Sequence, residues 1–252
     1  AQNELIEEFE YQPCKAVRTY KPKPGLQSEQ IIEAATLINN AKRPYILAGQ
    51  GILLSGATKE LIAFSEKTGI PVASTLLGLG AFPTNHPNYV GYLGMHGNYG
   101  PNINTNQCDV LIAVGMRFDD RVTGNVSKYA NQARVIHIEI DKAEINKIIK
   151  AEVAVHADAK EALTELVKHC KPNRFTEWIN SFKALNQEEF EKVVEKEIKN
   201  TNSLKMAEVV HMLSELTNGE AVVVTDVGQH QMVTSRYYKY KNPRTNITSG
   251  GA

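Results

Sequence analysis

Short apolar runs that alternate with helical patterns constrain this chain more than any other feature of its sequence. The run at residues 109–114, Asp-Val-Leu-Ile-Ala-Val, has the continuous apolar character of a strand buried on both faces. Comparable runs occur at residues 45–48, 71–76, 134–141 and 153–158. Because strands alternate with helices over residues 26–169, the sequence predicts an α/β fold with a doubly wound parallel sheet.

The segments between these runs carry the spacing of amphipathic helices. We expect helices at residues 28–39, 58–68, 102–106, 144–150 and 160–169. Ser28 is predicted to cap the first of them, and Gly69 to end the second. The sequence has no GxGxxG motif followed by an acidic residue about 20 positions later, which argues against an ordinary NAD site.

Composition shifts suggest how the chain is divided. Residues 1–25, with Pro13, Pro22 and Pro24, predict a linker, and residues 26–169 predict a nucleotide-binding type of domain. Residues 170–200 carry Glu and Lys at i,i+4 spacing and predict a solvated helix between domains. Residues 201–252 predict the start of a second α/β unit. There, a helix capped by Ser203 precedes a buried strand at 221–225. We expect both ends of the chain to be cuts in a longer protein.

Charge and cysteine usage exclude several classes of protein. The 28 basic and 28 acidic residues cancel, so the sequence predicts no nucleic-acid groove and no contact with an anionic membrane. No apolar run reaches the roughly 20 residues that a membrane-spanning helix needs. Cys14, Cys108 and Cys170 are far apart and predict neither a disulfide framework nor a metal site. Such cysteine usage favours a cytoplasmic protein.

A charged block follows the apolar run at 109–114. Gly115 allows another molecule to approach the backbone, and the guanidinium groups of Arg117 and Arg121 suit phosphate or carboxylate. Ligands of such sheets bind beyond the carboxyl ends of the strands. Alternatively, Asp119 and Asp120 pair with the arginines on a surface loop. The spacing alone does not decide between these two interpretations.

Other strand ends carry weaker signals. Gly49-Gln50-Gly51 closes the first strand either where a phosphate-bearing ligand passes or as an ordinary turn. Glu139 stands where an acid commonly binds ribose hydroxyls, and it would serve equally as the partner of a helix N-terminus. His230 is either a ligand contact or a plain residue at the start of a helix.

Three blocks of the sequence resemble one enzyme family. They are GLGAFP at residues 78–83, LGMHG at residues 93–97 and GMRFDDRVTG at residues 115–124. In these blocks, and in their order along nearly the whole chain, the sequence resembles the large catalytic subunit of acetohydroxyacid (acetolactate) synthase. The resemblance implies thiamine diphosphate, Mg²⁺ and a structural FAD as cofactors. The implied reaction condenses two pyruvates, or pyruvate and 2-oxobutanoate, with loss of CO2 in branched-chain amino-acid biosynthesis.

The resemblance also implies which residues contact the cofactors. Gly49 and Gly51 would lie by the diphosphate of FAD. The flavin would be lined by Thr75, Leu76, Leu93, Gly94, Met95 and His96. The part of FAD that adjoins the flavin would contact Gly115, Arg117, Asp119, Arg121 and Val122. The adenosine end would contact Glu139, Ile140 and Asp158. The diphosphate of thiamine diphosphate would face Gly228, Gln229 and His230, although the sequence departs from the family at Val233, where a Trp is usual.

By the same resemblance, some functional residues are expected outside this chain. The catalytic Glu would precede residue 1 and the magnesium motif would follow residue 252, so no catalytic or metal-binding residue is assigned and the chain alone is expected to be inactive. Asp226 is not that motif. The full-length enzyme would act on 2-oxo acids as a homodimer or larger assembly with a small regulatory subunit. The alternatives are a glyoxylate carboligase-like enzyme and a nucleotide-binding module without catalysis.

Overall fold

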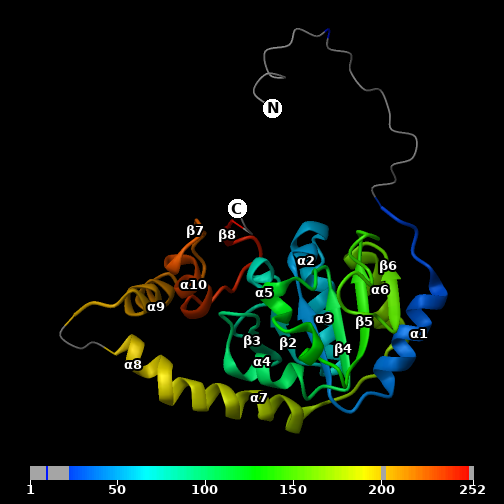
Figure 1. The fold of residues 1–252 in the computed structure, drawn as a ribbon, viewed down its shortest axis with the longest axis horizontal. Helices are drawn as coiled ribbons and strands as arrows, with labels where there is room; N and C mark the ends of the chain where they lie inside the picture. Colours follow the sequence, from blue (N-terminus) through cyan, green and yellow to red (C-terminus); the bar gives the residue numbers. More distant parts are fainter. Residues whose placement is uncertain (1–9, 11–22, 200–202, 250–252) are drawn as a thin grey trace.

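The computed structural model describes residue 10, residues 23–199 and residues 203–249. Six parallel strands form one sheet in the order β3-β2-β1-β4-β5-β6 (Figure 1). Their bounds are Pro44–Ala48 (β1), Val72–Ser74 (β2), Tyr89–Tyr92 (β3), Val110–Val114 (β4), Arg134–Glu139 (β5) and Val153–His156 (β6). The predicted doubly wound parallel sheet is therefore confirmed. The strand order reverses between β1 and β4, and sheets of this order bind ligands beyond that point.

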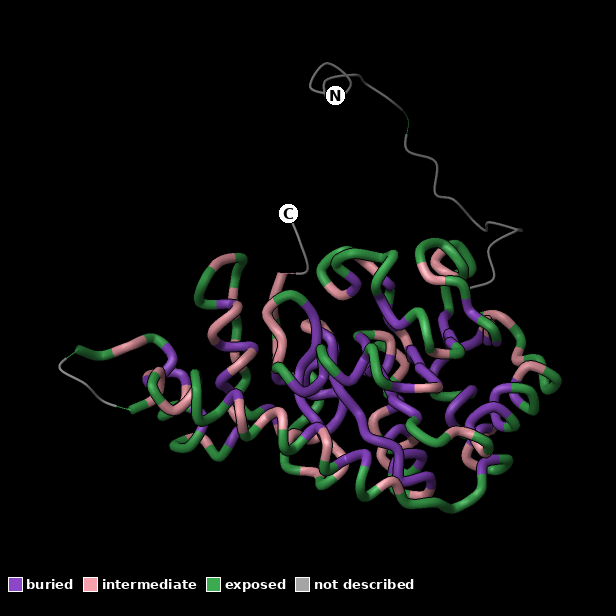
Figure 2. Tube along the Cα trace, turned by 60° about the horizontal axis from the view of Figure 1, so that its bottom comes forward, coloured by how far each residue is buried: buried purple, intermediate pink, exposed green. Residues whose placement is uncertain are grey.

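Helices cover both faces of the sheet. One face packs against α1 (Ser28–Asn39), α2 (Gln50–Ser55), α3 (Thr58–Thr68) and α6 (Ala159–His169), and the other against α4 (Tyr99–Thr105) and α7 (Thr176–Glu189). Along β4, Val110, Ile112 and Val114 point into the first layer, while Leu111 and Ala113 point into the second. Because both faces are covered, every residue of β4 is buried. Figure 2 shows buried segments gathered in the interior of the molecule.

A smaller unit follows the end of α7. The chain passes through a π-helical turn at Phe190–Val194 and α8 (Glu195–Ile198). It then forms α9 (Met206–Leu216), β7 (Val223–Thr225), α10 (Gln229–Tyr237) and β8 (Asn246–Thr248). Strands β7 and β8 pair in parallel. Tyr237, Tyr238 and Tyr240 of this unit share a buried cluster with Leu79 and Tyr92. Since Tyr92 ends β3 and Leu79 lies in the loop after β2, the smaller unit packs against the carboxyl edge of the large sheet (Figure 1).

Several predicted element ends prove right and two predicted caps prove wrong. Helix α1 spans the predicted residues, and α3 ends at Gly69, whose φ of +68° is left-handed. Ser28 does not cap α1, however, because the helix is preceded by Gln27, whose side chain forms no capping hydrogen bond. Ser203 likewise does not cap α9, which starts after Lys205.

The helix predicted at residues 144–150 is absent from the structure. Asn146 adopts a φ of +61°, which no α-helix accommodates, and its side chain accepts a hydrogen bond from the amide of Ala151 at 2.8 Å. Strand β3 was not predicted, because its four residues include Gly91, whose φ of +127° departs from a regular strand. Helix α2 was not predicted either.

The apolar run at residues 221–225 contains β7 (Val223–Thr225), but it is not the buried strand that the sequence predicts. Val224 is 72% exposed and Val222 is 62% exposed. Within the described residues, β8 is the only strand that pairs with β7. The run therefore has the right conformation without the neighbours that would bury it.

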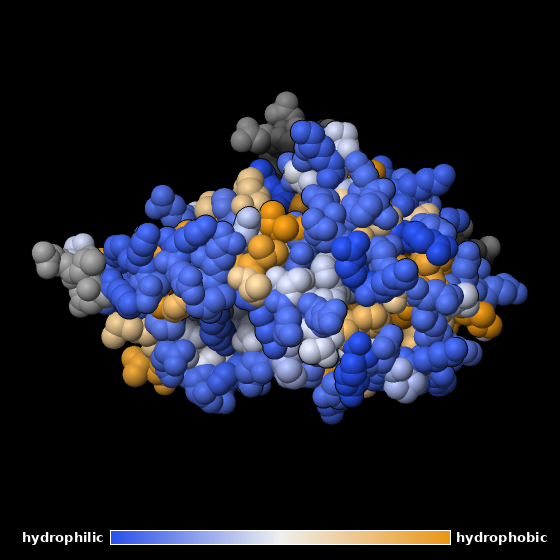
Figure 3. Space-filling view, turned by 90° about the horizontal axis from the view of Figure 1, so that it is seen from below, coloured by the Kyte–Doolittle hydropathy of each residue, from blue (hydrophilic) through white to orange (hydrophobic). Residues whose placement is uncertain are grey.

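The segment after residue 170, predicted as a solvated helix between domains, is helical, but its first helix is not solvated, because Trp178 and Phe182 of α7 are buried in the second core layer. Lys192 and Lys199 pair with Glu188 and Glu195 one turn before them, and these pairs are largely exposed. Figure 3, which looks at the molecule from below, shows a mainly hydrophilic face with scattered apolar patches. Most of the predicted N-terminal linker, including Cys14, lies outside the described residues. In the part of the chain that is described, no helix is long and apolar enough to cross a membrane.

Candidate functional site

Every residue that the sequence predicts to contact FAD lies at one edge of the large sheet. Glu139 is the last residue of β5. The others follow β1 (Gly49, Gly51), β2 (Thr75, Leu76), β3 (Leu93, Gly94, Met95, His96), β4 (Gly115, Arg117, Asp119, Arg121, Val122), β5 (Ile140) and β6 (Asp158). Because all six strands are parallel, their carboxyl ends meet at a single edge. The structure therefore brings residues spread over more than one hundred positions to the edge where such sheets bind ligands.

Three glycines meet where the strand order reverses. The amide of Gly49 donates to the carbonyl of Val114 at 2.9 Å, and the amide of Gly51 donates to that of Gly115 at 2.9 Å. A Cβ atom on Gly49 would lie 2.2 Å from the carbonyl oxygen of Gly115. The loops after β1 and β4 thus touch through their backbones. Glycine is required there by packing of the chain on itself, whether or not a ligand is also near.

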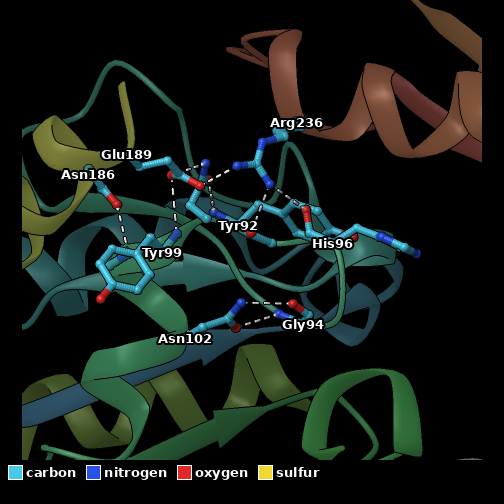
Figure 4. A network of polar contacts seen from close by, with 11 residues as sticks. Tyr92, Gly94, His96, Tyr99, Asn102, Asn186, Glu189 and Arg236 are labelled. Atoms are coloured by element: carbon cyan, nitrogen blue, oxygen red, sulfur yellow. Dashed lines mark hydrogen bonds and ion pairs between the residues drawn. The ribbon is translucent and has the colours of Figure 1, made fainter. Parts of the chain in front are cut away.

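The residues after β3 form a loop that is held from several sides, and we call residues 93–98 the 93–98 loop. The amide of Gly94 donates to Oδ1 of Asn102 at 3.0 Å, and its carbonyl accepts from Nδ2 of the same side chain at 2.9 Å (Figure 4). The amide of Met95 donates to the carbonyl of Arg121 at 2.8 Å. The loops after β3 and β4 are therefore joined, while the side chain of Met95 is 60% exposed.

The charged block after β4 contains the ion pair that the alternative interpretation predicts. Nη2 of Arg117 lies 3.9 Å from Oδ2 of Asp119, and the side chain of Arg117 is 60% exposed. Asp119 also caps α5 (Asp120–Thr123), since its Oδ1 accepts the amides of Arg121 and Val122 at 3.1 and 3.2 Å. Such an exposed pair contributes about 0–1 kcal/mol to stability. Most hydrogen-bond donors of the Arg117 guanidinium remain open to a ligand.

The two acidic residues at the carboxyl ends of β5 and β6, Glu139 and Asp158, accept hydrogen bonds from nearby backbone amides. Oε1 of buried Glu139 accepts the amides of Ile140 and Asp141 at 2.9 and 3.1 Å, so it caps a turn rather than a helix. Burial raises the pKa of Glu139 above its usual value, although these two amides act in the opposite direction. Asp158 caps α6, because its Oδ1 accepts the amides of Lys160 and Glu161.

The sequence Gly228-Gln229-His230 stands at the start of α10, as predicted. Gly228 has a φ of +149°, and its carbonyl accepts the amides of Gln231 and Met232. The first amides of a helix have no partner within the helix, so this turn presents donors to an anion. Gln229 and His230 are exposed beside it.

These groups fit the two cofactors that the resemblance implies. For FAD, the edge offers close backbone, an open guanidinium at Arg117 and the second oxygen of Glu139, which has no hydrogen-bond partner among the described residues. For a diphosphate, α10 offers its first amides. Among the described residues, no group of three or more His, Cys, Asp or Glu side chains is placed to hold a metal ion.

Two residues that sequence analysis did not identify support the 93–98 loop. Arg236 of α10 forms an ion pair with Glu189 of α7, and it also reaches the carbonyls of His96 and Gly97 (Figure 4). Glu189 belongs to a segment whose alternating charges predict a solvated helix, yet its side chain is only 7% exposed. No local pattern distinguishes Glu189 from the exposed glutamates beside it, because its partners are distant in sequence.

Comparison with known proteins gives one family and several close relatives. The thiamine pyrophosphate enzyme central domain matches residues 31–166. The acetolactate synthase large subunit of Lactococcus lactis subsp. lactis is 43% identical over 233 residues, which cover 92% of this chain and 40% of that protein. The probable acetolactate synthase large subunit of Methanocaldococcus jannaschii is 41% identical over 242 residues (92% and 40%).

A plant relative shows similar coverage. Acetolactate synthase 1, chloroplastic, of Nicotiana tabacum is 40% identical over 250 residues, which cover 95% of this chain and 36% of that protein. The chain thus spans about two fifths of the length of the curated relatives that it matches.

Proposed function

Because the chain belongs to the thiamine pyrophosphate enzymes, whose central domain its residues 31–166 match, we propose that it is part of an acetolactate synthase large subunit. The proposal depends on one observation. Over 92% of its length, the chain is 43% and 41% identical to two such subunits. Those relatives come from a bacterium and an archaeon. The reaction proposed for the whole protein is condensation of two pyruvates, or of pyruvate and 2-oxobutanoate, with loss of CO2.

In this proposal the carboxyl edge of the large sheet binds FAD. The flavin lies against the loops after β2 and β3, and the loop after β4 contacts the part of FAD that adjoins the flavin. The adenosine end lies by Glu139, Ile140 and Asp158. Arg117 is the main charged contact, because its guanidinium is exposed and its ion pair with Asp119 is long. FAD has a structural role there, since the proposed reaction involves no net oxidation or reduction.

The start of α10 is proposed to hold the diphosphate of thiamine diphosphate through backbone amides near Gly228, Gln229 and His230. When bound, thiamine diphosphate supplies the chemistry of decarboxylation and carbon–carbon bond formation. This chain contributes orientation, and Mg²⁺ and the catalytic Glu are assigned to other parts of the protein. The relatives named as large subunits favour a small regulatory subunit as a partner. We place the enzyme, at least a homodimer, in the cytoplasm.

A chimaera tests the proposed activity. The homologous segment of the Lactococcus lactis large subunit is replaced by this chain, and formation of acetolactate from pyruvate is measured with thiamine diphosphate, Mg²⁺ and FAD. We expect turnover above that of a chimaera carrying Arg117→Ala. A chimaera that folds and binds FAD but forms no acetolactate would contradict the proposal.

Cofactor choice is tested on the chain itself. Titration of the 252-residue chain with FAD and with NAD, followed by flavin fluorescence and by calorimetry, is expected to give a lower Kd for FAD. Tighter binding of NAD than of FAD would contradict the assignment of the sheet edge to a flavin.

A further inference from the structure

The 93–98 loop is held by two helices that are remote from it in sequence. Nη2 of Arg236, in the last turn of α10, forms an ion pair with Oε1 of Glu189, at the end of α7. Nη1 of the same arginine donates to the carbonyls of His96 at 3.4 Å and Gly97 at 3.2 Å. One guanidinium therefore bridges the end of α7 and the 93–98 loop, as the close view in Figure 4 shows.

The second oxygen of Glu189 fixes the far end of the loop. Oε2 accepts a hydrogen bond from Nδ2 of Asn98 at 3.1 Å and another from the amide of Tyr99 at 3.1 Å. Tyr99 begins α4, so the carboxylate also stands at the N-terminus of that helix. Asn186, one turn earlier on α7, accepts the amide of Gly100 at 3.1 Å. The end of α7 thus caps the start of α4.

Low exposure of both partners makes this pair different from the other ion pairs among the described residues. The side chains of Glu189 and Arg236 are 7% and 22% exposed, whereas those of Arg134 and Glu152 are 56% and 44% exposed. An exposed pair contributes little to stability. Removing one member of a buried pair leaves a charge without compensation, which is strongly unfavourable. The loop and both helices should therefore rearrange together when Arg236 is lost.

Helix α10 also carries the proposed diphosphate turn. Gly228 precedes its first residue and Arg236 lies in its last turn, so the helical rise separates the two by only about 12 Å. The same rigid element thus begins at one proposed cofactor region and ends against the loop of the other.

We infer that Arg236 and Glu189 are positioning residues that hold the 93–98 loop in the conformation that lines the flavin. Flavin affinity at the sheet edge then depends on the docking of α10, although neither side chain is among the proposed FAD contacts. This inference rests on the proposed function for its flavin, but the positioning of the loop can be tested without any cofactor.

The first arm of the test measures the loop alone. Amide hydrogen exchange of peptides covering the 93–98 loop is compared between the unaltered chain, Arg236→Ala and Arg134→Ala. The last variant breaks an exposed Arg–Glu pair at the opposite edge of the sheet and serves as the matched control. We expect at least about fivefold faster exchange in the loop of Arg236→Ala only. Exchange in β1, β4 and β5 should stay unchanged in both variants.

The second arm measures FAD affinity. The Kd for FAD should rise at least about fivefold in Arg236→Ala and in Glu189→Gln, and stay unchanged in Arg134→Ala. Arg236→Lys keeps the positive charge beside Glu189, so it should restore part of the affinity and of the protection from exchange. This variant separates loss of the ion pair from general damage to α10.

The outcomes separate this inference from the proposed function. Unchanged exchange in the 93–98 loop of Arg236→Ala overturns the positioning role. Faster exchange with an unchanged Kd for FAD overturns the link between the loop and the flavin. If the unaltered chain binds no FAD, the flavin site of the proposed function fails and the flavin part of this inference fails with it. The exchange arm still decides the positioning role in that case.

Discussion

Strands β4 and β7 have similar sequences and very different surroundings. The first reads Val-Leu-Ile-Ala-Val and is buried at every residue, while the second reads Val-Val-Thr within an equally apolar run and is buried at none. Strand β4 lies between β1 and β5 with helices over both faces. Strand β7 pairs only with β8 among the described residues. Both regions are built from parallel strands, so the number of neighbours accounts for the difference.

This contrast separates two contributions to a strand. Local sequence determines that a run of β-branched residues is extended. Burial depends on what other segments supply, and burial provides most of the stability through the hydrophobic effect. The large sheet should therefore be the stable part of the molecule. The β7–β8 unit should depend on its contacts with the sheet edge, namely the buried tyrosine cluster and the Arg236–Glu189 pair.

Matched isoleucines at the centres of two strands test this contrast most strongly. Ile112 of β4 is fully buried, whereas Ile247 of β8 is 47% exposed. We expect Ile112→Ala to lower the free energy of unfolding by about 2–5 kcal/mol, because it removes buried methyl groups and leaves a cavity. Ile247→Ala should lower it by less than about 1 kcal/mol.

Unfolding in urea can be followed by the fluorescence of Trp178, the single tryptophan. Its indole Nε1 donates to the carbonyl of Pro44 at 2.8 Å, and its ring packs in the second core layer, so it reports on the large sheet. Equal shifts of the urea midpoint for the two alanine variants would contradict the contrast between the regions.

The same contrast explains what the sequence predicted well. Five of the six sheet strands follow from continuous apolar runs, and the span of α1 follows from helically spaced apolar residues, because both patterns meet the buried layers that they imply. The two predicted serine caps were wrong because a serine near the start of a helix need not occupy the N-cap position. Gln27 and Lys205 occupy that position in α1 and α9. The predicted helix at 144–150 failed because hydrogen bonds of side chains such as Asn146 favour turns.

For the candidate site, the sequence predicted where the site residues lie, but not which residues hold the 93–98 loop in place. Glycines and charged residues after strands pointed to the carboxyl edge, because the topology of a parallel sheet fixes where such residues must lie. Arg236 and Glu189 could not be predicted, since they stand 47 positions apart in the sequence and no periodic signal connects them. Their role arises from how the smaller unit docks on the sheet.

A change at the edge of the sheet should affect binding without affecting folding. Arg117→Ala is expected to raise the Kd for FAD at least tenfold, because a charge-assisted hydrogen bond contributes about 1.5–3 kcal/mol. The urea midpoint should stay unchanged, since the pair with Asp119 is exposed and 3.9 Å long. Unchanged FAD affinity would leave Arg117 as a surface ion-pair residue and would weaken the assignment of the whole edge.

The glycine contact between the loops after β1 and β4 should affect both the stability of the protein and its affinity for FAD. Gly49→Ala places a Cβ atom 2.2 Å from the carbonyl oxygen of Gly115, so the two loops must separate. We expect a loss of about 1–3 kcal/mol in the free energy of unfolding, together with weaker FAD binding. Gly25→Ala is the control, because nothing lies within 4 Å of its Cβ position. Urea midpoints and FAD titrations that match for both variants would show that the loops yield without strain.

Low pH should reduce the stability of the large sheet through one buried histidine, and so bring it closer to that of the β7–β8 unit. The ring of His137 on β5 is fully buried, and its Nε2 donates to the carbonyl of Met116 at 2.9 Å. Burial lowers the pKa of His137 below its usual value. Between that lowered pKa and about 6.5, the unfolded chain binds a proton that the folded sheet does not. Stability should therefore fall as the pH drops below about 6.5.

The contribution of His137 can be isolated by difference. One proton changes the free energy of unfolding by at most about 1.36 kcal/mol per pH unit, so this is the smallest of the expected effects. Urea midpoints from Trp178 fluorescence are measured from pH 7.5 to 5.5 in the unaltered chain and in His137→Gln, whose amide keeps a donor for Met116. The unaltered chain should lose stability more steeply below pH 6.5, because only it carries the imidazole, while Glu139 titrates equally in both proteins. Parallel pH profiles would show that His137 accepts its proton as readily in the folded sheet as in the unfolded chain.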